Sequence, residues 1–215
     1  MPTVLRVTEI FHSIQGESTH AGRPCVFVRL TGCNLRCVWC DTAHAFHGGT
    51  SMTVSEVLER VRGYGCEWVE ITGGEPLLQT EAYELMQTLV DQGFSVLIET
   101  GGSLPIDRVP AGVRRIVDVK CPGSGEVGQN RWENLDQLRD GDELKFVLAD
   151  RDDYDWAVRQ LRDRALAERA PVLFSPVHEA LDPGEMARWV LDDRLPVRVQ
   201  LQMHKTLWPG VEEGV

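Results

Sequence analysis

Strand-length apolar runs alternate along this chain with segments that carry the apolar spacing of amphipathic helices. The runs are rich in Val, Ile, Leu and Phe, which is typical of buried strands. Eight strands are expected, at residues 4–11, 25–30, 68–71, 94–98, 115–119, 143–148, 172–174 and 197–201. Because strands that alternate with helices are joined by crossover connections, the pattern predicts an α/β protein with a largely parallel sheet.

Four amphipathic segments lie between these runs. The first begins at a capping box, Thr53-Val54-Ser55-Glu56, after which apolar residues recur at helical spacing. The second has its apolar stripe at 82–90 and ends at Gly93, and the third has its stripe at 154–165. The fourth starts at 182–185, where an Asp caps the helix and a Pro occupies its first turn.

The chain length limits how these units can be arranged. A complete eight-fold barrel typically needs about 250 residues, whereas this chain has 215 and leaves 41–51 and 121–131 for loops. No internal repeat or long linker divides the chain, so residues 1–215 are expected to form a single domain. The prediction is an incomplete, open barrel of TIM type. Its chemistry should gather in the loops that follow the strands, where the unusual sequence lies.

Composition argues against several classes of protein. The formal net charge is −11, which disfavours a nucleic-acid partner, because phosphate binding needs a basic face. No run of 18 apolar residues is present, so no membrane-spanning helix is expected. Because no secretion signal is visible, we expect a cytoplasmic, reducing location, in which the six cysteines are thiols or metal ligands rather than disulfides.

Three of the cysteines lie within eight residues. Cys33, Cys37 and Cys40 have the spacing C-x3-C-x2-C and follow the second predicted strand. Three thiolates on one loop can hold three corners of a 4Fe-4S cluster, which ordinarily has four cysteine ligands, and one iron then stays open to another chelator. The alternative is a zinc site in which His44 completes a Cys3His set. Structural zinc sites more often use two separated pairs of ligands, so the spacing favours the cluster.

With an aromatic residue before its last cysteine, this loop resembles the signature of the radical S-adenosylmethionine (SAM) enzymes. In them the open iron binds the amino and carboxylate groups of SAM, and an electron from the cluster yields the 5′-deoxyadenosyl radical, which abstracts a substrate hydrogen. The resemblance implies that Trp39 lies beside the adenine, although the spacing alone also fits a core aromatic residue.

The segment 72–76, Thr-Gly-Gly-Glu-Pro, follows the third predicted strand. Taken alone it is a turn, but it is similar to the superfamily segment that binds the amino group of SAM. Glycines let the backbone approach a ligand, and free carbonyls can accept hydrogen bonds from an ammonium. The resemblance therefore makes Gly74 and Glu75 candidate cofactor contacts.

Two later loops carry weaker signals. The loop 99–102 is either a plain turn or a place where Glu99 faces the site. The loop 118–124 contains Lys120, one of three lysines in a chain with nineteen arginines, and a retained lysine supplies a compact point charge. Similar loops in the superfamily contact the ribose and carboxylate of SAM, so Lys120 and Ser124 are candidate cofactor contacts. The sequence identifies no general base, and the carboxylates considered for that role are Glu75 and Glu99.

Three further features concern a substrate. Gln15 and Glu17, side by side after the first strand, suit the amide and amino edge of a pterin or guanine, although a polar turn has the same composition. Arg29 lies among apolar strand residues and needs an anion, from either the protein or a substrate. Thr42 follows the last cluster cysteine, and its hydroxyl is a candidate ligand for Mg²⁺, although a turn or helix cap is the ordinary use of Asp-Thr.

Together with the C-terminal Gln202-Met203-His204-Lys205, these motifs resemble the 7-carboxy-7-deazaguanine synthase family over nearly the whole chain. That family converts 6-carboxy-5,6,7,8-tetrahydropterin to 7-carboxy-7-deazaguanine with loss of ammonia, on the pathway to queuosine and other 7-deazapurines. It forms homodimers with a reduced barrel and depends on Mg²⁺. The resemblance implies Mg²⁺ binding at Thr42 and substrate contacts at Ile14, Gln15, Gly16, Glu17, Arg29 and Thr72. It also implies an electron donor such as flavodoxin or ferredoxin.

The chain departs from the family pattern at Ser18-Thr19 and in its tail, 206–215. Roles for His204 and for the terminal carboxylate of Val215 therefore stay open. The nearest alternative function is a small radical SAM activating enzyme that makes a glycyl radical on a partner protein. An alternative from another class is a non-catalytic zinc or iron–sulfur module.

Overall fold

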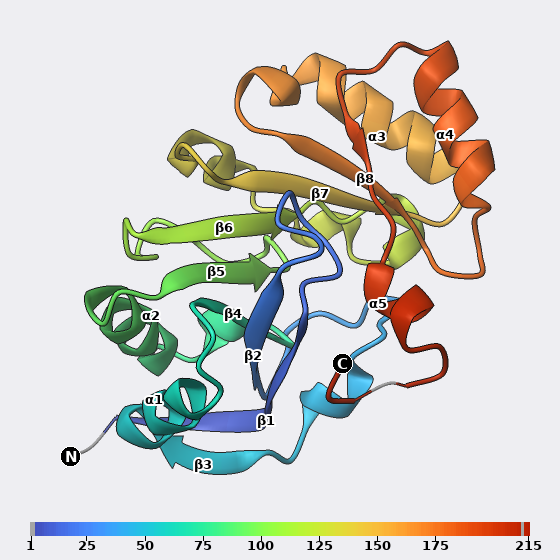
Figure 1. The fold of residues 1–215 in the computed structure, drawn as a ribbon. Helices are drawn as coiled ribbons and strands as arrows, with labels where there is room; N and C mark the ends of the chain where they lie inside the picture. The colour runs from blue at the N-terminus through green and yellow to red at the C-terminus, as the bar shows by residue number, and fades with distance from the viewer. Residues whose placement is uncertain (1–2, 212) are drawn as a thin grey trace.

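The computed structural model describes residues 3–211 and 213–215, and this part of the chain forms one nine-stranded sheet (Figure 1). The strand order is β3-β1-β2-β4-β5-β6-β7-β8-β9. From β2 to β9 every pairing is parallel, whereas β1 is antiparallel to both β2 and β3. The strands are β1 Val4–Ile14, β2 Pro24–Leu30, β3 Thr50–Thr53, β4 Trp68–Gly73, β5 Ser95–Thr100, β6 Val113–Asp118, β7 Glu143–Leu148, β8 Val172–Pro176 and β9 Arg198–Val199.

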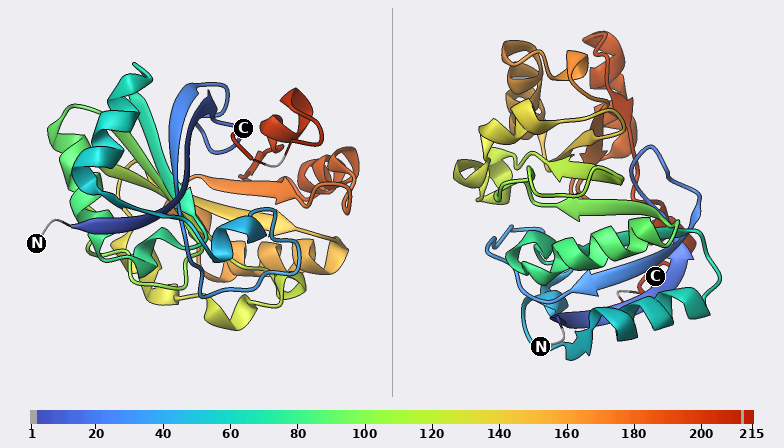
Figure 2. Two further views of the ribbon diagram at one scale, coloured as in Figure 1. Left: turned by 90° about the horizontal axis from the view of Figure 1, so that it is seen from below. Right: turned by 90° about the vertical axis from the view of Figure 1, so that its left-hand side faces the viewer.

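The helices that cross between the parallel strands lie outside the curved sheet (Figure 2). Strands β4 to β9 follow each other in chain order, and right-handed crossovers then place every connecting helix on the same face. These helices are α1 Val54–Gly63, α2 Glu81–Asp91, α3 Arg151–Asp163 and α4 Pro183–Asp192. A short fifth helix, α5 Met203–Leu207, lies instead beside the loop that joins β1 to β2.

Side-chain alternation separates an apolar core from a polar interior. On β7, Leu144, Phe146 and Leu148 are fully buried in the main hydrophobic cluster, between the sheet and the helices. Their neighbours Glu143 and Lys145 point to the opposite, inner face, because successive strand residues alternate between faces. The outer face of the parallel sheet is therefore packed with hydrocarbon, whereas its inner face carries polar side chains.

The predicted open barrel is confirmed, since the edge strands β3 and β9 are not paired with each other in the described residues. The prediction of a loop at 41–51 was wrong in part: the segment contains a 3-10 helix, Ala43–Phe46, and the start of β3. β3 pairs with β1, which its polar composition did not reveal. The predicted domain, 1–215, includes residues 1, 2 and 212, which lie outside the described part. No helix there is long and apolar enough to cross a membrane.

Candidate functional site

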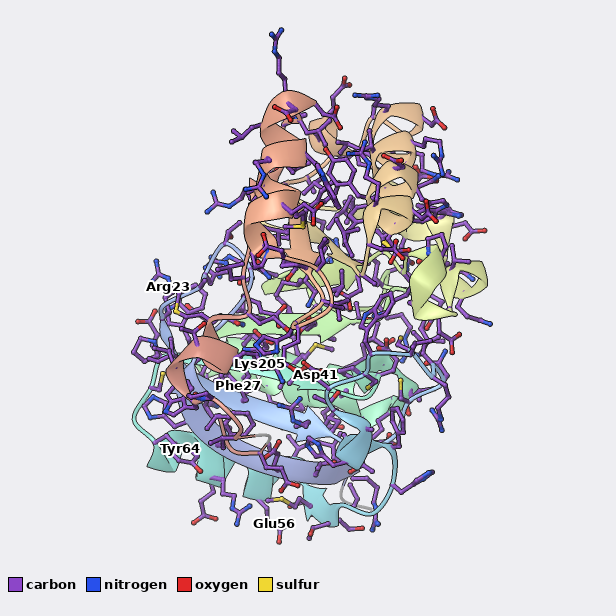
Figure 3. The ribbon with its side chains drawn as sticks, turned by 90° about the vertical axis from the view of Figure 1, so that its right-hand side faces the viewer. Arg23, Phe27, Asp41, Glu56, Tyr64 and Lys205 are labelled. Carbon is purple, nitrogen blue, oxygen red and sulfur yellow. The ribbon has the colours of Figure 1, made fainter. Side chains whose placement is uncertain are left out.

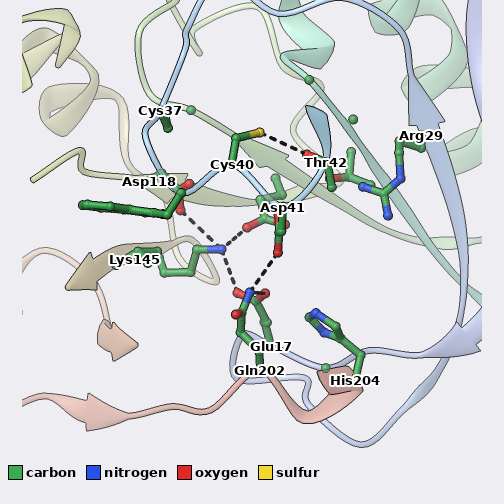
Figure 4. A pocket seen from close by; sticks show the side chains of 18 of the residues that line it. Glu17, Arg29, Cys37, Cys40, Asp41, Thr42, Asp118, Lys145, Gln202 and His204 are labelled. Atoms are coloured by element: carbon green, nitrogen blue, oxygen red, sulfur yellow. Dashed lines mark hydrogen bonds and ion pairs between the residues drawn. The ribbon is translucent and has the colours of Figure 1, made fainter. Parts of the chain in front are cut away.

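A cavity of about 340 Å³ lies at the carboxyl ends of the parallel strands (Figure 4). It is lined by the loop after β2, the ends of β4 to β7, and the C-terminal segment. Because β1 is antiparallel to β2, the loop that joins them reaches the cavity from the other end of the barrel. The cavity lining includes most of the predicted site residues, namely Ile14, Gln15, Gly16, Glu17, Arg29, Cys33, Cys37, Trp39, Cys40, Thr42, Thr72, Gly74 and Lys120.

The cysteine loop brings three free, half-buried thiols to this cavity. Burial raises the pKa of the Cys33 and Cys37 thiols. His44 is turned away from them, with Nε2 3.5 Å from the Glu9 carboxylate. Among residues 3–211 and 213–215, no group of three or more His, Cys, Asp or Glu is arranged to hold a single metal ion. The donor set thus fits a cluster held by Cys33, Cys37 and Cys40 better than a Cys3His zinc ion.

The glycine turn after β4 packs directly on the cysteine loop. A Cβ on Gly74 would lie 2.2 Å from the Gly32 carbonyl oxygen and 2.7 Å from Cys33 Cβ. Gly73 has a φ of +143°, and a Cβ there would lie 2.2 Å from the Leu30 carbonyl oxygen. These close approaches require glycine, and they fix the turn against the three thiols.

Two predicted cofactor contacts do not line the cavity. Glu75 is buried and accepts hydrogen bonds from Leu77 N at 3.0 Å, Thr100 Oγ1 at 2.8 Å and Gly101 N at 2.7 Å. Ser124 is also buried, and its hydroxyl donates to the Cys121 carbonyl at 2.6 Å. Neither side chain faces the cavity. Glu75 joins the turn after β4 to the loop after β5, whereas Ser124 bonds within its own loop. Their contacts with a cofactor stay predictions.

Lys120 reaches the cavity from the loop after β6. Its ammonium lies 2.6 Å from Asp118 Oδ2. Burial alone would lower the pKa of Lys120, but the Asp118 carboxylate outweighs it and raises the pKa. Burial would likewise raise the pKa of Asp118, and the ammonium groups of Lys120 and Lys145 lower it instead. Both groups are therefore charged at neutral pH, and Lys120 is already neutralised by the protein.

The Gln15 amide is held on both sides by protein groups. Its oxygen accepts a hydrogen bond from Glu17 N at 2.8 Å, and its nitrogen donates to Glu70. Glu70 is buried on β4, and burial, reinforced by Glu99, raises its pKa well above the ordinary value. Both oxygens of Glu17 also have donors, Gln202 Nε2 at 3.0 Å and Lys145 Nζ at 2.8 Å. The loop after β1 is thus fixed before any ligand enters.

Arg29 has a protein carboxylate as its partner. Its Nε donates to Glu9 Oε1 on β1 at 2.6 Å, and its guanidinium lies 5.5 Å from the centroid of the Phe11 ring. The second oxygen of Glu9 accepts from Gly214 N at 3.0 Å, which brings the end of the chain to the cavity. Thr72 is the register partner of Arg29 on β4. Arg29 still lines the cavity, but it does not need a substrate anion to be neutralised.

The C-terminal segment links the loop after β1 to the end of the cysteine loop. Gln202 Nε2 donates to Glu17 and also to Asp41 Oδ2, at 3.2 Å. Lys205 Nζ lies 3.7 Å from the same Asp41 oxygen (Figure 3). The His204 ring lies so close to Gly16 that a Cβ there would be 2.5 Å from Nδ1. Asp41 precedes Thr42, whose hydroxyl lies 3.8 Å from Cys40 Sγ.

Sequence reasoning missed two buried charges of the barrel interior, Glu70 and Lys145. Lys145 lies at the centre of the cavity, where its ammonium pairs with Glu17, Glu99 and Asp118 (Figure 4). Burial would lower the pKa of Lys145, but the three carboxylates raise it well above its ordinary value. A signal was present: Glu70 is the one charged residue of its apolar strand run, and Glu143 and Lys145 alternate with apolar residues in theirs, so these charges lie on the opposite face from the core.

Comparison with known proteins identifies the family to which a chain with this cysteine loop and glycine turn belongs. Residues 27–119 match the model of the radical SAM superfamily. The 7-carboxy-7-deazaguanine synthase of Koribacter versatilis is 47% identical, over 98% of this chain and 100% of the relative, and that of Chlorobaculum tepidum is 45% identical, over 98% and 97%. The crystal structure of QueE from Escherichia coli superposes with a TM-score of 0.74 at 24% identity, covering 94% of this chain and 95% of that one. The chain belongs to the 7-carboxy-7-deazaguanine synthase family of radical SAM enzymes.

Proposed function

We propose that this protein converts 6-carboxy-5,6,7,8-tetrahydropterin to 7-carboxy-7-deazaguanine with loss of ammonia. One observation carries the proposal: three free thiols, a glycine turn and a buried amide–carboxylate pair face the same 340 Å³ cavity. A non-catalytic cluster module has no use for a preset heterocycle pocket beside its cluster. An enzyme that activates a protein would need a site open to a polypeptide.

The cofactors are assigned to the cysteine loop and its neighbours. Cys33, Cys37 and Cys40 would hold the 4Fe-4S cluster, and Trp39, Gly74 and Lys120 would contact SAM. When bound, the cluster and SAM supply the radical that removes a hydrogen atom from the substrate. The Trp39 ring packs on Gly123, where a Cβ would lie 3.1 Å from it, so its position is set by the loop after β6.

The chain's own residues hold the substrate. Gln15 and Glu17 would bind the amide and amino edge of the pterin, and their fixed conformations reduce the entropy lost on binding. Ile14, Gly16 and Thr72 would complete this contact. At the other end, Arg29 and a Mg²⁺ ion at Thr42 would hold the substrate carboxylate, because Mg²⁺ commonly shares its shell between one protein oxygen, water and substrate oxygens.

Glu99 is the better candidate for the group that exchanges a proton with the substrate. It lines the cavity, and burial together with the charges of Glu17 and Asp118 raises its pKa to about 7, although Lys145 opposes the shift. A base works best when its pKa lies near the working pH. Glu75, the other carboxylate considered, accepts hydrogen bonds from three donor groups and does not face the cavity.

The remaining parts of the proposal rest on the family. We propose a homodimer, an electron donor such as flavodoxin or ferredoxin, and a cytoplasmic location in which the thiols stay reduced. Neither a nucleic acid nor a membrane is proposed as a partner, although the product is destined for a modified nucleoside.

Anaerobic incubation with carboxytetrahydropterin, SAM, Mg²⁺ and dithionite tests the function. The expected result is 7-carboxy-7-deazaguanine with release of ammonia. If iron-loaded protein does not form that product, the proposed function is wrong. Metal analysis after anaerobic purification tests the alternative of a non-catalytic zinc module. One zinc per chain without sulfide would identify such a module.

The magnesium assignment has its own test. Thr42→Ser keeps the hydroxyl and should retain Mg²⁺-dependent activity, whereas Thr42→Ala should lose most of it. The iron content of both variants serves as the control, because Thr42 lies two residues from Cys40. Equal Mg²⁺ activation of the wild type and both variants would refute the assignment.

A further inference from the structure

Two inward-facing residues of β7 contact the loop between β1 and β2 at two points. Glu143 and Lys145 lie two residues apart on β7, so they share one face of the sheet. Their partners, Thr19 and Glu17, are also two residues apart, and they follow in the opposite direction along the chain. Each of the two strand residues therefore contacts one residue of the loop, Glu143 with Thr19 and Lys145 with Glu17.

The inner contact is an ion pair at the floor of the cavity. Lys145 Nζ lies 2.8 Å from Glu17 Oε2, and the Lys145 residue is 4% exposed. It fixes the carboxylate that we assign to the substrate's amino edge. Because Lys145 also lines the cavity, its loss would change the binding site itself.

The outer contact lies outside the cavity. Thr19 N donates to Glu143 Oε2 at 2.9 Å and to Oε1 at 3.2 Å, and the Thr19 hydroxyl donates to Oε1. Glu143 is 2% exposed, and burial raises its pKa despite these bonds. In the described part of the chain, all hydrogen-bond donors to this carboxylate come from Thr19. The His20 ring lies 4.0 Å away, but burial lowers its pKa and so disfavours its charged form. The positive charges of Arg198 and Lys145 act on Glu143 only from a greater distance.

A buried carboxylate without a close cation is costly, so its contact with Thr19 needs a reason. The intervening Ser18 has a φ of +64°, a left-handed conformation that is unfavourable for a residue with a Cβ. Its hydroxyl accepts a hydrogen bond from His20 N at 3.0 Å. Such a conformation persists only where the surroundings determine it, and the contacts at Glu17 and Thr19 do so on either side of Ser18.

We propose that Glu143, acting through Thr19, is a positioning residue that sets Glu17 for substrate binding, with Lys145 as the second fixed point. The inference rests on the proposed function, in which Glu17 binds the heterocycle. It assigns a purpose to Ser18-Thr19, the place where the chain departs from the family pattern. Glu143 touches neither substrate nor cofactor, because it does not line the cavity.

The test is steady-state kinetics of the iron-loaded enzyme with carboxytetrahydropterin. Thr19→Val removes the hydroxyl but keeps the shape, and it should raise the KM for this substrate about tenfold while kcat changes less than about twofold, since one charge-assisted hydrogen bond is lost. Thr19→Ser restores the hydroxyl and should return the KM to near the wild-type value. Thr80→Val is the matched control, because Thr80 is exposed and its hydroxyl makes no cap hydrogen bond.

Substrate-independent cleavage of SAM measures the cluster and the cofactor site separately, and it should be equal in all variants. An unchanged KM in Thr19→Val, with normal wild-type turnover, overturns the inference alone. A wild type that makes no deazaguanine overturns the proposed function instead. If Thr19→Val fails to fold, Glu143→Leu, which removes both acceptor oxygens, must show at least the same rise in KM. If neither variant folds, the contact is merely structural and the inference is wrong.

Discussion

Lys145→Met should lower the thermal stability of the protein. The ammonium is buried and pairs with the carboxylates of Glu17, Glu99 and Asp118. Breaking a buried ion pair from one side costs about 3–5 kcal/mol, because unpaired charge stays behind. Two of the three carboxylates keep another donor, which reduces the loss. We therefore expect a loss of about 2–3 kcal/mol.

Glu99 makes this loss depend on pH. Its pKa is raised from the ordinary 4.5 to about 7, so the folded protein binds a proton that the unfolded chain releases between these values. Stability therefore falls as the pH rises from 4.5 through 7. Without Lys145 the pKa rises further, and the fall extends to higher pH. The difference between wild type and variant should widen by about 1 kcal/mol from pH 6 to pH 8, since one proton contributes about 1.4 kcal/mol per pH unit.

Thermal melts of anaerobically purified protein at both pH values measure the effect. For a chain of this size, 1 kcal/mol shifts Tm by about 2–4 °C, so we expect losses of about 4–8 °C at pH 6 and about 6–12 °C at pH 8. In a Glu99→Gln background the added loss at pH 8 should vanish. Equal losses at the two pH values, or a pH dependence that survives in that background, would refute the reasoning.

Two further predictions concern packing. Gly74→Ala should reduce iron and sulfide content, because the new Cβ would lie 2.2 Å from the Gly32 carbonyl oxygen, whereas Gly128→Ala, with nothing within 4 Å, should not. Full loading of the Gly74 variant would contradict the close packing of the two loops. Arg115→Met should cost about 3–5 kcal/mol, because Arg115 is fully buried and paired with a carboxylate. Arg131→Met, which removes an exposed pair with Glu133, should cost less than about 1 kcal/mol. If thermal melts show a larger loss of stability for the Arg131 variant than for the Arg115 variant, the larger contribution assigned to the buried ion pair would be refuted.

Much of the fold could be predicted from the chain because apolar spacing is a local property. The seventh strand, Glu143–Leu148, was predicted with its observed bounds, and the capping box at Thr53 starts α1 as expected. β3 was missed because its four residues, Thr50–Thr53, owe their conformation to pairing with β1 rather than to their own composition. Helix α5 was missed for a similar reason, since its first residue, Met203, is held by the Gly16 carbonyl.

The candidate site divides in the same way. The sequence by itself determined the family and the segments that carry the chemistry, because the cysteine spacing and the glycine turn are short-range patterns. Only the tertiary structure decided which charges meet. Lys145 and Glu17 are 128 residues apart, and the Glu143–Thr19 pair is separated by 124. Those partners depend on strand order and on which face of each strand turns inward, and neither can be deduced from one segment alone.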